Sequence, residues 1–250
     1  MSVSYLQPNW SAPAHVKAFS TTRQGGLSGS VYGSFNIGAH VGDSERCVNL
    51  NRQKLCDDLG LPSDPVWLSQ IHGTEVINLD ALAAGAADRS TAFNADGTYS
   101  SRKSTVCVVM TADCLPLLLT DREGTQVAAV HVGWRGLAKG IIENAVAQFT
   151  CTASNVIAWA GPCIGPDKFE IGDDVRQQLG GSHDCYSISD DNTLLANLHR
   201  LCGQRLKALG VEDYVYTKAC TYSDSEQYFS YRRDGECGRM ASLIWIDSGI

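Results

Sequence analysis

Two apolar runs separated by a short polar turn constrain this chain more than any other feature. Residues 115–120 read LPLLLT, residues 127–132 read VAAVHV, and the turn opens with DREG at 121–124. Apolar runs of this length predict buried β-strands, and so short a turn makes consecutive strands antiparallel neighbours. We therefore expect a β-hairpin at the centre of the fold.

The expected pairing of this hairpin brings a thiol and an imidazole together. If Asp121 faces Gly124 across the turn, Cys114 lies directly opposite His131. Directly paired residues have Cβ atoms about 4.5–5.5 Å apart, close enough for the two side chains to share a metal ion. A slip of one residue would turn them to opposite faces of the sheet.

Further strands and helices are expected on both sides of the hairpin. The predicted strands include residues 105–110, 155–160 and 240–246, and the predicted helices span 44–59, 136–149 and 193–209. Strands and helices are interspersed, and no linker or repeat interrupts them. We expect an α/β (α+β) sandwich, a mixed β-sheet core flanked by helices, in a single domain over residues 1–250.

Charge and composition exclude several classes of partner. Net charge is −7, hydrophobic residues make up 44% of the 250 residues, and no basic block is present. These values are typical of a globular protein and argue against nucleic acid or an anionic membrane as the main partner. The chain has neither a signal-peptide pattern nor an apolar run near ~18 residues, so we expect a cytoplasmic protein. Its ten cysteines form no CxxC pair, which favours reduced thiols.

A third metal-capable side chain lies upstream of the hairpin. His72 belongs to the segment QIHGTEV (70–76), beside a strand and next to a glycine. Zinc accepts imidazole and thiolate ligands, and catalytic zinc sites use three protein ligands with a fourth position for water. His72, Cys114 and His131 are therefore candidate zinc ligands. The alternative, a buried free cysteine and two unrelated histidines, stays open at this point.

Several arginines in expected loops are candidates for binding an anion. Arg23 lies in a glycine-rich stretch (15–42), Arg233 lies in a charged turn, and Arg135 follows the hairpin at a strand-to-helix junction. Arginine pairs readily with phosphate and carboxylate, although plain surface charge explains the same residues.

With these residues in view, the chain resembles the laccase-domain family. That family is also described as multicopper polyphenol oxidoreductases and as bacterial purine nucleoside phosphorylase/adenosine deaminase enzymes. The matching segments are TTRQGGLS (21–28), SFNIGAHVGD (34–43), NRQKL (51–55), QIHGTEV (70–76), ADGTYS (95–100), TADCLPLLLTD (111–121), AAVHVGWRG (128–136), AGPCIGP (160–166) and YRRDGECGRMASLIWI (231–246). They follow the family order over nearly the whole chain. Cys237 stands where threonine is common.

The resemblance implies a zinc site made by His72, Cys114 and His131. Cu²⁺ is an alternative ion for this site in vitro. It also implies phosphorolysis of adenosine, inosine and S-methyl-5'-thioadenosine, and hydrolytic deamination of adenosine to inosine. The expected partners are purine nucleosides and phosphate. For phosphate we predict a cradle of Arg23 and Asn36, with Arg135 and Arg233 as further candidates, and for the proton donor we predict Asp113.

Three other functions remain open from the sequence. Cys114 with a histidine base would suit an amide hydrolase that edits cytoplasmic peptidoglycan precursors. Copper-dependent phenol oxidation is expected to be weak, because six histidines are few for a trinuclear centre. A metal-sensing module would close the site with a fourth protein ligand.

Overall fold

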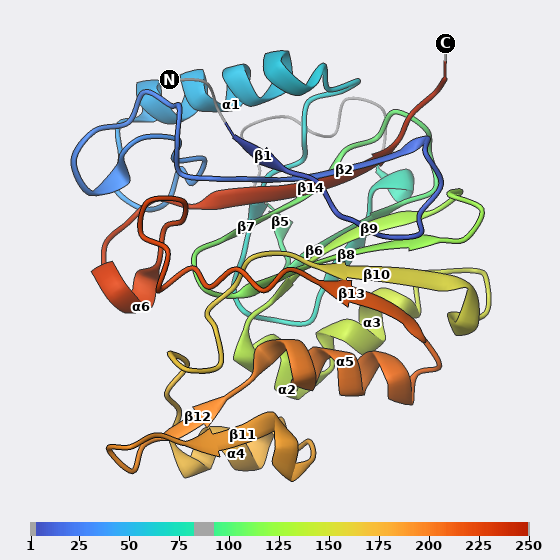
Figure 1. The fold of residues 1–250 in the computed structure, drawn as a ribbon. Helices are drawn as coiled ribbons and strands as arrows, with labels where there is room; N and C mark the ends of the chain where they lie inside the picture. Colours follow the sequence, from blue (N-terminus) through green and yellow to red (C-terminus); the bar gives the residue numbers. More distant parts are fainter. Residues whose placement is uncertain (1–3, 83–92, 250) are drawn as a thin grey trace.

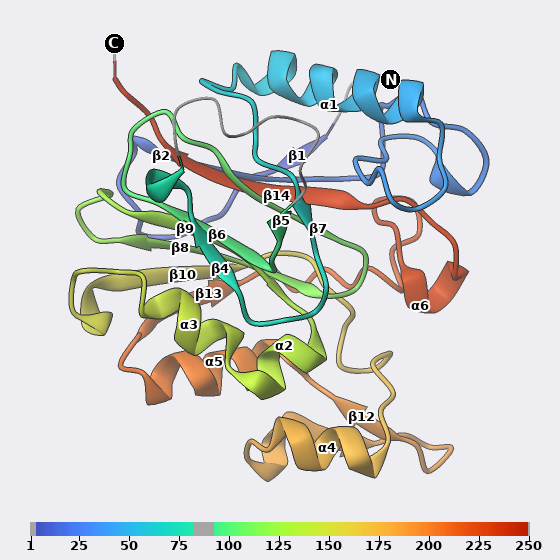
Figure 2. The same ribbon diagram turned by 180° about the vertical axis from the view of Figure 1, so that it is seen from behind.

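Two β-sheets stacked face to face form the centre of the computed structural model, which describes residues 4–82 and 93–249. Figures 1 and 2 show helix α1 (Glu45–Leu59) over one outer face of this sandwich and helices α2, α3 and α5 over the other. The remaining helices are α2 (Trp134–Lys139), α3 (Ile141–Val146), α4 (Asp173–Leu179), α5 (Leu198–Ala208) and α6 (Tyr231–Asp234), with 3₁₀ turns at Ser30–Tyr32, Leu79–Ala81, Ala153–Asn155 and His183–Cys185.

The smaller sheet is antiparallel and the larger one is mixed. The smaller contains, in spatial order, β1 (Tyr5–Leu6), β2 (Val16–Thr21), β14 (Met240–Ile246) and β7 (Cys107–Thr111). The larger contains β13 (Asp213–Tyr216), β10 (Val156–Ala160), β8 (Leu115–Asp121), β9 (Val127–Val132), β6 (Gly97–Ser100) and β4 (Val76–Asn78). Two short ribbons pair β11 (Tyr186–Ile188) with β12 (Leu194–Ala196) and β3 (Leu68–Ser69) with β5 (Phe93–Asn94).

Apolar side chains from both sheets fill the space between them. Val109 and Ile244 of the smaller sheet belong to the same buried cluster as Leu118 and Ala129 of the larger one. The α/β sandwich predicted from the sequence is confirmed, with two sheets in place of a single mixed one. A buried strand has the same apolar pattern in either sheet, so this pattern alone does not show to which sheet the strand belongs.

The central hairpin forms as predicted, but its register differs by two residues. Leu115 pairs with Val132 and Thr120 with Val127, so Cys114 is not directly opposite His131. The Asp121 side chain causes the difference, because its Oδ1 accepts hydrogen bonds from the backbone N–H groups of Thr125 (2.6 Å) and Gln126 (3.2 Å) and lengthens the turn. A shift of two preserves side-chain direction. Cys114, directly before β8, therefore stays near His131 on a diagonal.

Two predicted helices begin or break at places that local chemistry explains. The helix expected over 136–149 is interrupted at Gly140, where φ is +97° and the N–H caps α2 through the carbonyls of Gly136 and Leu137. The helix expected from residue 193 begins only at Leu198, because residues 194–196 pair as β12 and Asn197 caps the next turn. No helix within the described residues is long and apolar enough to cross a membrane.

Candidate metal centre

The structure brings together the three side chains that the sequence nominates as metal ligands. One imidazole nitrogen each of His72 and His131 and the Cys114 Sγ lie within 4.8 Å of one another. The distance from Cys114 Sγ to His72 Nε2 is 3.8 Å. The two imidazole rings lie edge to face, with centroids 4.8 Å apart. Two imidazoles and a thiol suit zinc or copper.

Each ligand comes from a different segment around the end of the hairpin. His131 is the penultimate residue of β9 and is 4% exposed, whereas Cys114 directly precedes β8. His72 follows β3 in a loop and has a φ of +58°. A left-handed conformation is uncommon for a residue other than glycine, so its surroundings must hold it there.

A buried carboxylate holds the His72 loop in this conformation. Asp96 Oδ1 accepts the backbone N–H of His72 at 2.9 Å, and Oδ2 accepts those of Ile71 at 3.2 Å and Gly73 at 2.6 Å. Asp96 itself is fully buried. Three backbone donors converging on one acid replace the hydrogen bonds that a regular element would provide.

The same carboxylate orients His131. Its Oδ1 lies 2.8 Å from His131 Nδ1, and the Asp96 carbonyl accepts the His131 backbone N–H at 2.7 Å. With Nδ1 bound to the carboxylate, Nε2 is the nitrogen left for a metal. Metal-binding histidines commonly use their second nitrogen in this way. Sequence reasoning missed Asp96, whose only signal was its place in ADGTYS (95–100).

Gln70 ties the His72 loop to the smaller sheet. Its side-chain amide donates to the Met110 carbonyl at 2.7 Å and its carbonyl accepts the Met110 N–H at 2.7 Å. Met110 lies on β7, an edge strand. The amide therefore satisfies both backbone groups that a further strand would otherwise pair with.

The charges of the cluster favour a thiolate. Burial opposes ionisation of Cys114, but the neighbouring His131 and His72 outweigh it and lower the pKa of this thiol to about 6. Burial likewise opposes protonation of His131, but Cys114 and Asp96 raise its pKa to about 9. In the metal-free protein the two therefore form a thiolate–imidazolium pair. A thiolate is the form of cysteine that binds metal.

Gly133 leaves room for two of the ligands. A side chain starting there would lie 2.7 Å from His72 Cδ2 and 3.3 Å from Cys114 Sγ. Because the first distance is shorter than real Cβ contacts, glycine is required at this position while His72 keeps its place. The donor set, the oriented imidazole and this free space together fit a bound metal ion.

Asp113, the expected proton donor, is an anchor between two segments of the chain. Its φ is +90°, and its side chain is 8% exposed. Oδ1 accepts from the Thr221 hydroxyl at 2.7 Å and Oδ2 from the Arg232 backbone N–H at 2.6 Å. Both carboxylate oxygens of Asp113 are thus already hydrogen-bonded within the protein.

Arg23 and Asn36, the expected cradle for phosphate, both make hydrogen bonds within the protein. Arg23 donates to the carbonyls of Gly33 at 3.0 Å and Ser225 at 2.9 Å. Asn36 is fully buried, and its side chain bonds to Gly38, Asp43 and Arg239. The glycine-rich loop needs these internal hydrogen bonds because it has few apolar side chains to pack.

The two other arginine candidates differ from each other. Arg233 donates to the carbonyls of Thr221, Tyr222 and Tyr228 and pairs with Asp234, so it holds its own turn together. Arg135 is exposed and lies 4.4 Å from the centre of the Trp134 ring. Arg135 therefore remains a candidate ligand for phosphate.

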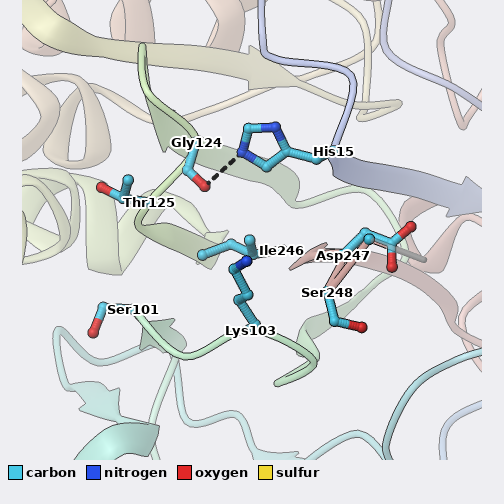
Figure 3. Close-up of a pocket in the computed structure, with 9 residues that line it drawn as sticks. His15, Ser101, Lys103, Gly124, Thr125, Ile246, Asp247 and Ser248 are labelled. Carbon is cyan, nitrogen blue, oxygen red and sulfur yellow. Dashed lines mark hydrogen bonds between the residues drawn. The ribbon is translucent and has the colours of Figure 1, made fainter.

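A pocket of about 420 Å³ lies at the turn of the hairpin (Figure 3), beside the Gly124–His15 hydrogen bond of 3.1 Å. Its lining residues, among them Lys103 and Asp247, include none of the three ligands. The turn and the ligands occupy opposite ends of β8. We therefore assign the chemistry to the ligand cluster and not to this pocket.

A family model described as multi-copper polyphenol oxidoreductase laccase matches residues 17–247 of the chain. The chain belongs to this family. Relatives in it cover nearly all of the sequence. A purine nucleoside phosphorylase of Haemophilus influenzae is 41% identical, over 97% of this chain and 99% of its own length. The purine nucleoside phosphorylase YfiH of Escherichia coli is 44% identical, over 96% of this chain and 98% of its own.

Solved structures of similar proteins share the fold. A Neisseria meningitidis protein superposes with a TM-score of 0.89 at 41% identity, covering 98% of this chain and 99% of its own. YlmD from Geobacillus stearothermophilus gives a TM-score of 0.88 at 28% identity, with coverage of 98% and 99%. The sandwich is thus the fold of experimentally determined relatives.

Proposed function

We propose that this chain is a zinc-dependent purine nucleoside enzyme. It cleaves adenosine, inosine and S-methyl-5'-thioadenosine with phosphate, and it also deaminates adenosine to inosine by hydrolysis. The observation that carries the proposal is the His72–Cys114–His131 cluster, in a chain whose full-length relatives bear the name purine nucleoside phosphorylase. The unit that performs this chemistry is one domain over residues 1–250, working in the cytoplasm with all ten cysteines unpaired.

His72, Cys114 and His131 would hold the zinc ion. When bound, zinc supplies a Lewis acid that polarises an oxygen of the substrate or of water. The three candidate ligands come from the loop after β3 and from the facing ends of β8 and β9.

The residues around the ligands contribute binding and proton handling. Asp96 keeps Nδ1 of His131 protonated and the ring in one orientation. Arg135 supplies an exposed positive charge two residues after Gly133. Asp113 acts as an acid toward the leaving group only after releasing Thr221 or Arg232, so we assign its first role to holding those segments.

Product analysis tests this function directly. Zinc-loaded protein is incubated with adenosine, with and without inorganic phosphate, and the products are separated by chromatography. We expect adenine and ribose 1-phosphate only when phosphate is present, and inosine in both incubations. Absence of all three products would refute the function.

A second function is favoured by one observation, the lowered pKa of Cys114. A thiolate between two imidazoles is the arrangement of a cysteine nucleophile, which would serve an amide hydrolase acting on cytoplasmic peptidoglycan precursors. Chelation separates the two functions. Amide hydrolysis that persists after removal of zinc would favour the thiol enzyme, whereas its dependence on zinc would favour the metal site.

A further inference from the structure

Arg239 lies at the end of the smaller sheet closest to the ligand cluster. Met240, the first residue of β14, pairs antiparallel with Thr111, the last residue of β7. Continuing this register places Arg239 beside Ala112, two residues before the ligand Cys114. The sheet therefore places the Arg239 backbone near the segment that carries Cys114.

The stem of Arg239 is fixed by the segment 36–38. Its backbone N–H donates to Asn36 Oδ1 at 2.8 Å, and its carbonyl accepts the Ile37 N–H at 3.1 Å. Its Cγ lies only 2.8 Å from the position that a Gly38 Cβ would take, so the side chain passes directly over this glycine. The backbone and the first side-chain carbons of Arg239 therefore have little conformational freedom.

Most of the guanidinium hydrogens of Arg239 are not used by the protein. Its hydrogen bonds to the described residues all involve Nη1, which donates to the carbonyls of Cys237 (2.8 Å) and Gly238 (3.0 Å) and to the Cys237 sulfur (3.5 Å), and its Cζ lies 5.8 Å from the centre of the Tyr231 ring. Nε and Nη2 carry three further N–H donors. Together they form one edge of the planar fork that binds a phosphate through two parallel hydrogen bonds.

His40 lies within electrostatic range of Arg239 and His131. It follows the 36–38 segment by two residues and is exposed. Partial burial and the positive charges of Arg239, Arg52 and His131 lower the pKa of His40, so the ring is neutral at pH 7 and can donate one N–H.

The acids nearest in sequence accept hydrogen bonds from groups other than Arg239 and His40. Asp43 accepts from the Ser28 hydroxyl and the Asn36 amide, and Glu236 accepts from the Tyr32 hydroxyl. The charges that lower the pKa of His40 are those of Arg239, Arg52 and His131. In a chain with a net charge of −7, these cationic side chains beside His40 favour a bound anion.

We propose that Arg239 and His40 form an oxyanion site at the edge of the His72–Cys114–His131 cluster, and that this site binds inorganic phosphate. Its catalytic meaning rests on the proposed phosphorolysis, in which this phosphate is the second substrate. Arg239 supplies the charge and the planar fork, and His40 supplies a neutral donor. The site takes the place of the Arg23–Asn36 cradle, whose polar groups are used within the loop.

Substitution of Arg239 by methionine tests the site with little change to the fold. Arg239→Met keeps the Cβ and Cγ that lie over Gly38 and both backbone hydrogen bonds, but removes the guanidinium. Arg239→Lys restores the charge without the fork, and His40→Ala removes the second donor. The matched control is Arg122→Met, at the hairpin turn, where Arg122 pairs with Asp213 at 3.3 Å.

Phosphate binding to the zinc-loaded variants is measured by titration calorimetry, alongside the KM for phosphate and for adenosine. Arg239→Met is expected to weaken phosphate binding at least about tenfold, the loss typical of a charge-assisted hydrogen-bond pair, with an unchanged zinc content and adenosine KM. Arg239→Lys and His40→Ala should give smaller losses, and Arg122→Met none. Wild-type phosphate affinity in both Arg239→Met and His40→Ala would overturn the proposal. If Arg239→Met fails to fold, as judged by its zinc content, Arg239→Lys and His40→Ala decide in the same way.

The outcomes separate this site from the proposed function. Phosphate binding that depends on Arg239, in a protein that does not turn over nucleosides, would keep the site and refute the phosphorylase. Phosphate-dependent turnover that ignores Arg239 and His40 would keep the phosphorylase and refute the site. Phosphate binding that is lost in Cys114→Ala but kept in Arg239→Met would mean that phosphate binds the metal alone, which also refutes the site.

Discussion

Asp96 and His131 are joined twice, through a 2.8 Å contact between side chains and a 2.7 Å hydrogen bond between backbones. Because the same carboxylate also accepts the N–H of His72 at 2.9 Å, one buried acid fixes two of the three candidate ligands. The fold itself therefore sets the arrangement of these two side chains.

Replacing Asp96 should weaken metal binding. The asparagine side chain in Asp96→Asn has nearly the same size as that of aspartate. Its N–H₂ group, however, would face another hydrogen-bond donor, either the His131 ring or a backbone N–H of the His72 loop. Loss of such an outer partner typically costs about 10- to 100-fold in metal affinity. Zinc affinity is measured by competition with a chromophoric chelator, with Asp213→Asn as the surface control. Equal zinc affinities for Asp96→Asn and wild type would show that the carboxylate does not position the ligands.

Gly133→Ala should disturb the ligands directly. The added methyl group would lie 2.7 Å from His72 Cδ2, so His72 must move away from Cys114. Gly29→Ala is the matched control, since a Cβ there meets nothing within 4 Å and φ is −111°. We expect zinc affinity to fall at least about tenfold in Gly133→Ala only, by analogy with other changes that displace a ligand. An unchanged affinity would mean that the loop adapts.

Cys114 should be alkylated in its thiolate form below neutral pH in the metal-free protein. Its pKa is lowered to about 6, so its reaction with iodoacetamide should rise through pH 6 and level off by pH 7. Cys107 is the internal control, because burial raises its pKa to about 12 and should leave it unreactive. Peptide mass spectrometry follows both cysteines at once. A midpoint near 8.5 for Cys114 would contradict the assigned thiolate–imidazolium pair.

His199 should make the protein less stable as the pH falls. Burial lowers its pKa from 6.5 to about 4, so the unfolded chain binds a proton that the folded chain refuses between these values. Stability is therefore full above pH 6.5 and declines below it, by about 2 kcal/mol at pH 5 according to proton linkage.

Urea unfolding of zinc-loaded protein at pH 7 and pH 5 measures this loss. His199→Phe keeps the ring that stacks on Tyr216 at 4.6 Å but cannot titrate. The wild type should lose about 2 kcal/mol more than this variant, the same linkage term. Equal losses of unfolding free energy in the wild type and in His199→Phe would show that the pH dependence comes from other groups.

The sequence was sufficient to select His72, Cys114 and His131 as candidate ligands, which the structure brings together, but not the residues that position them. His72, Cys114 and His131 have side chains whose chemistry marks them as ligands wherever they occur. Asp96 binds through its surroundings, three backbone N–H groups and one imidazole, which only the folded chain assembles.

The hairpin shows the same limit at smaller scale. Its strands follow from apolar runs, but its register depends on which turn N–H groups the Asp121 carboxylate accepts. The arginine candidates show a related limit. A loop arginine such as Arg23 or Arg233 looks free in sequence, whereas in the fold its guanidinium binds carbonyls that no strand or helix satisfies.

The rate of adenine formation from adenosine and phosphate tests the central claim most directly when wild type and Cys114→Ala are compared at equal zinc supply. The control is Cys47→Ala, at a partly exposed helical position outside the cluster. We predict that Cys114→Ala loses bound zinc and nearly all phosphorolysis, while Cys47→Ala matches the wild type. Equal turnover by Cys114→Ala and wild type would contradict the assignment of the reaction to the His72–Cys114–His131 centre.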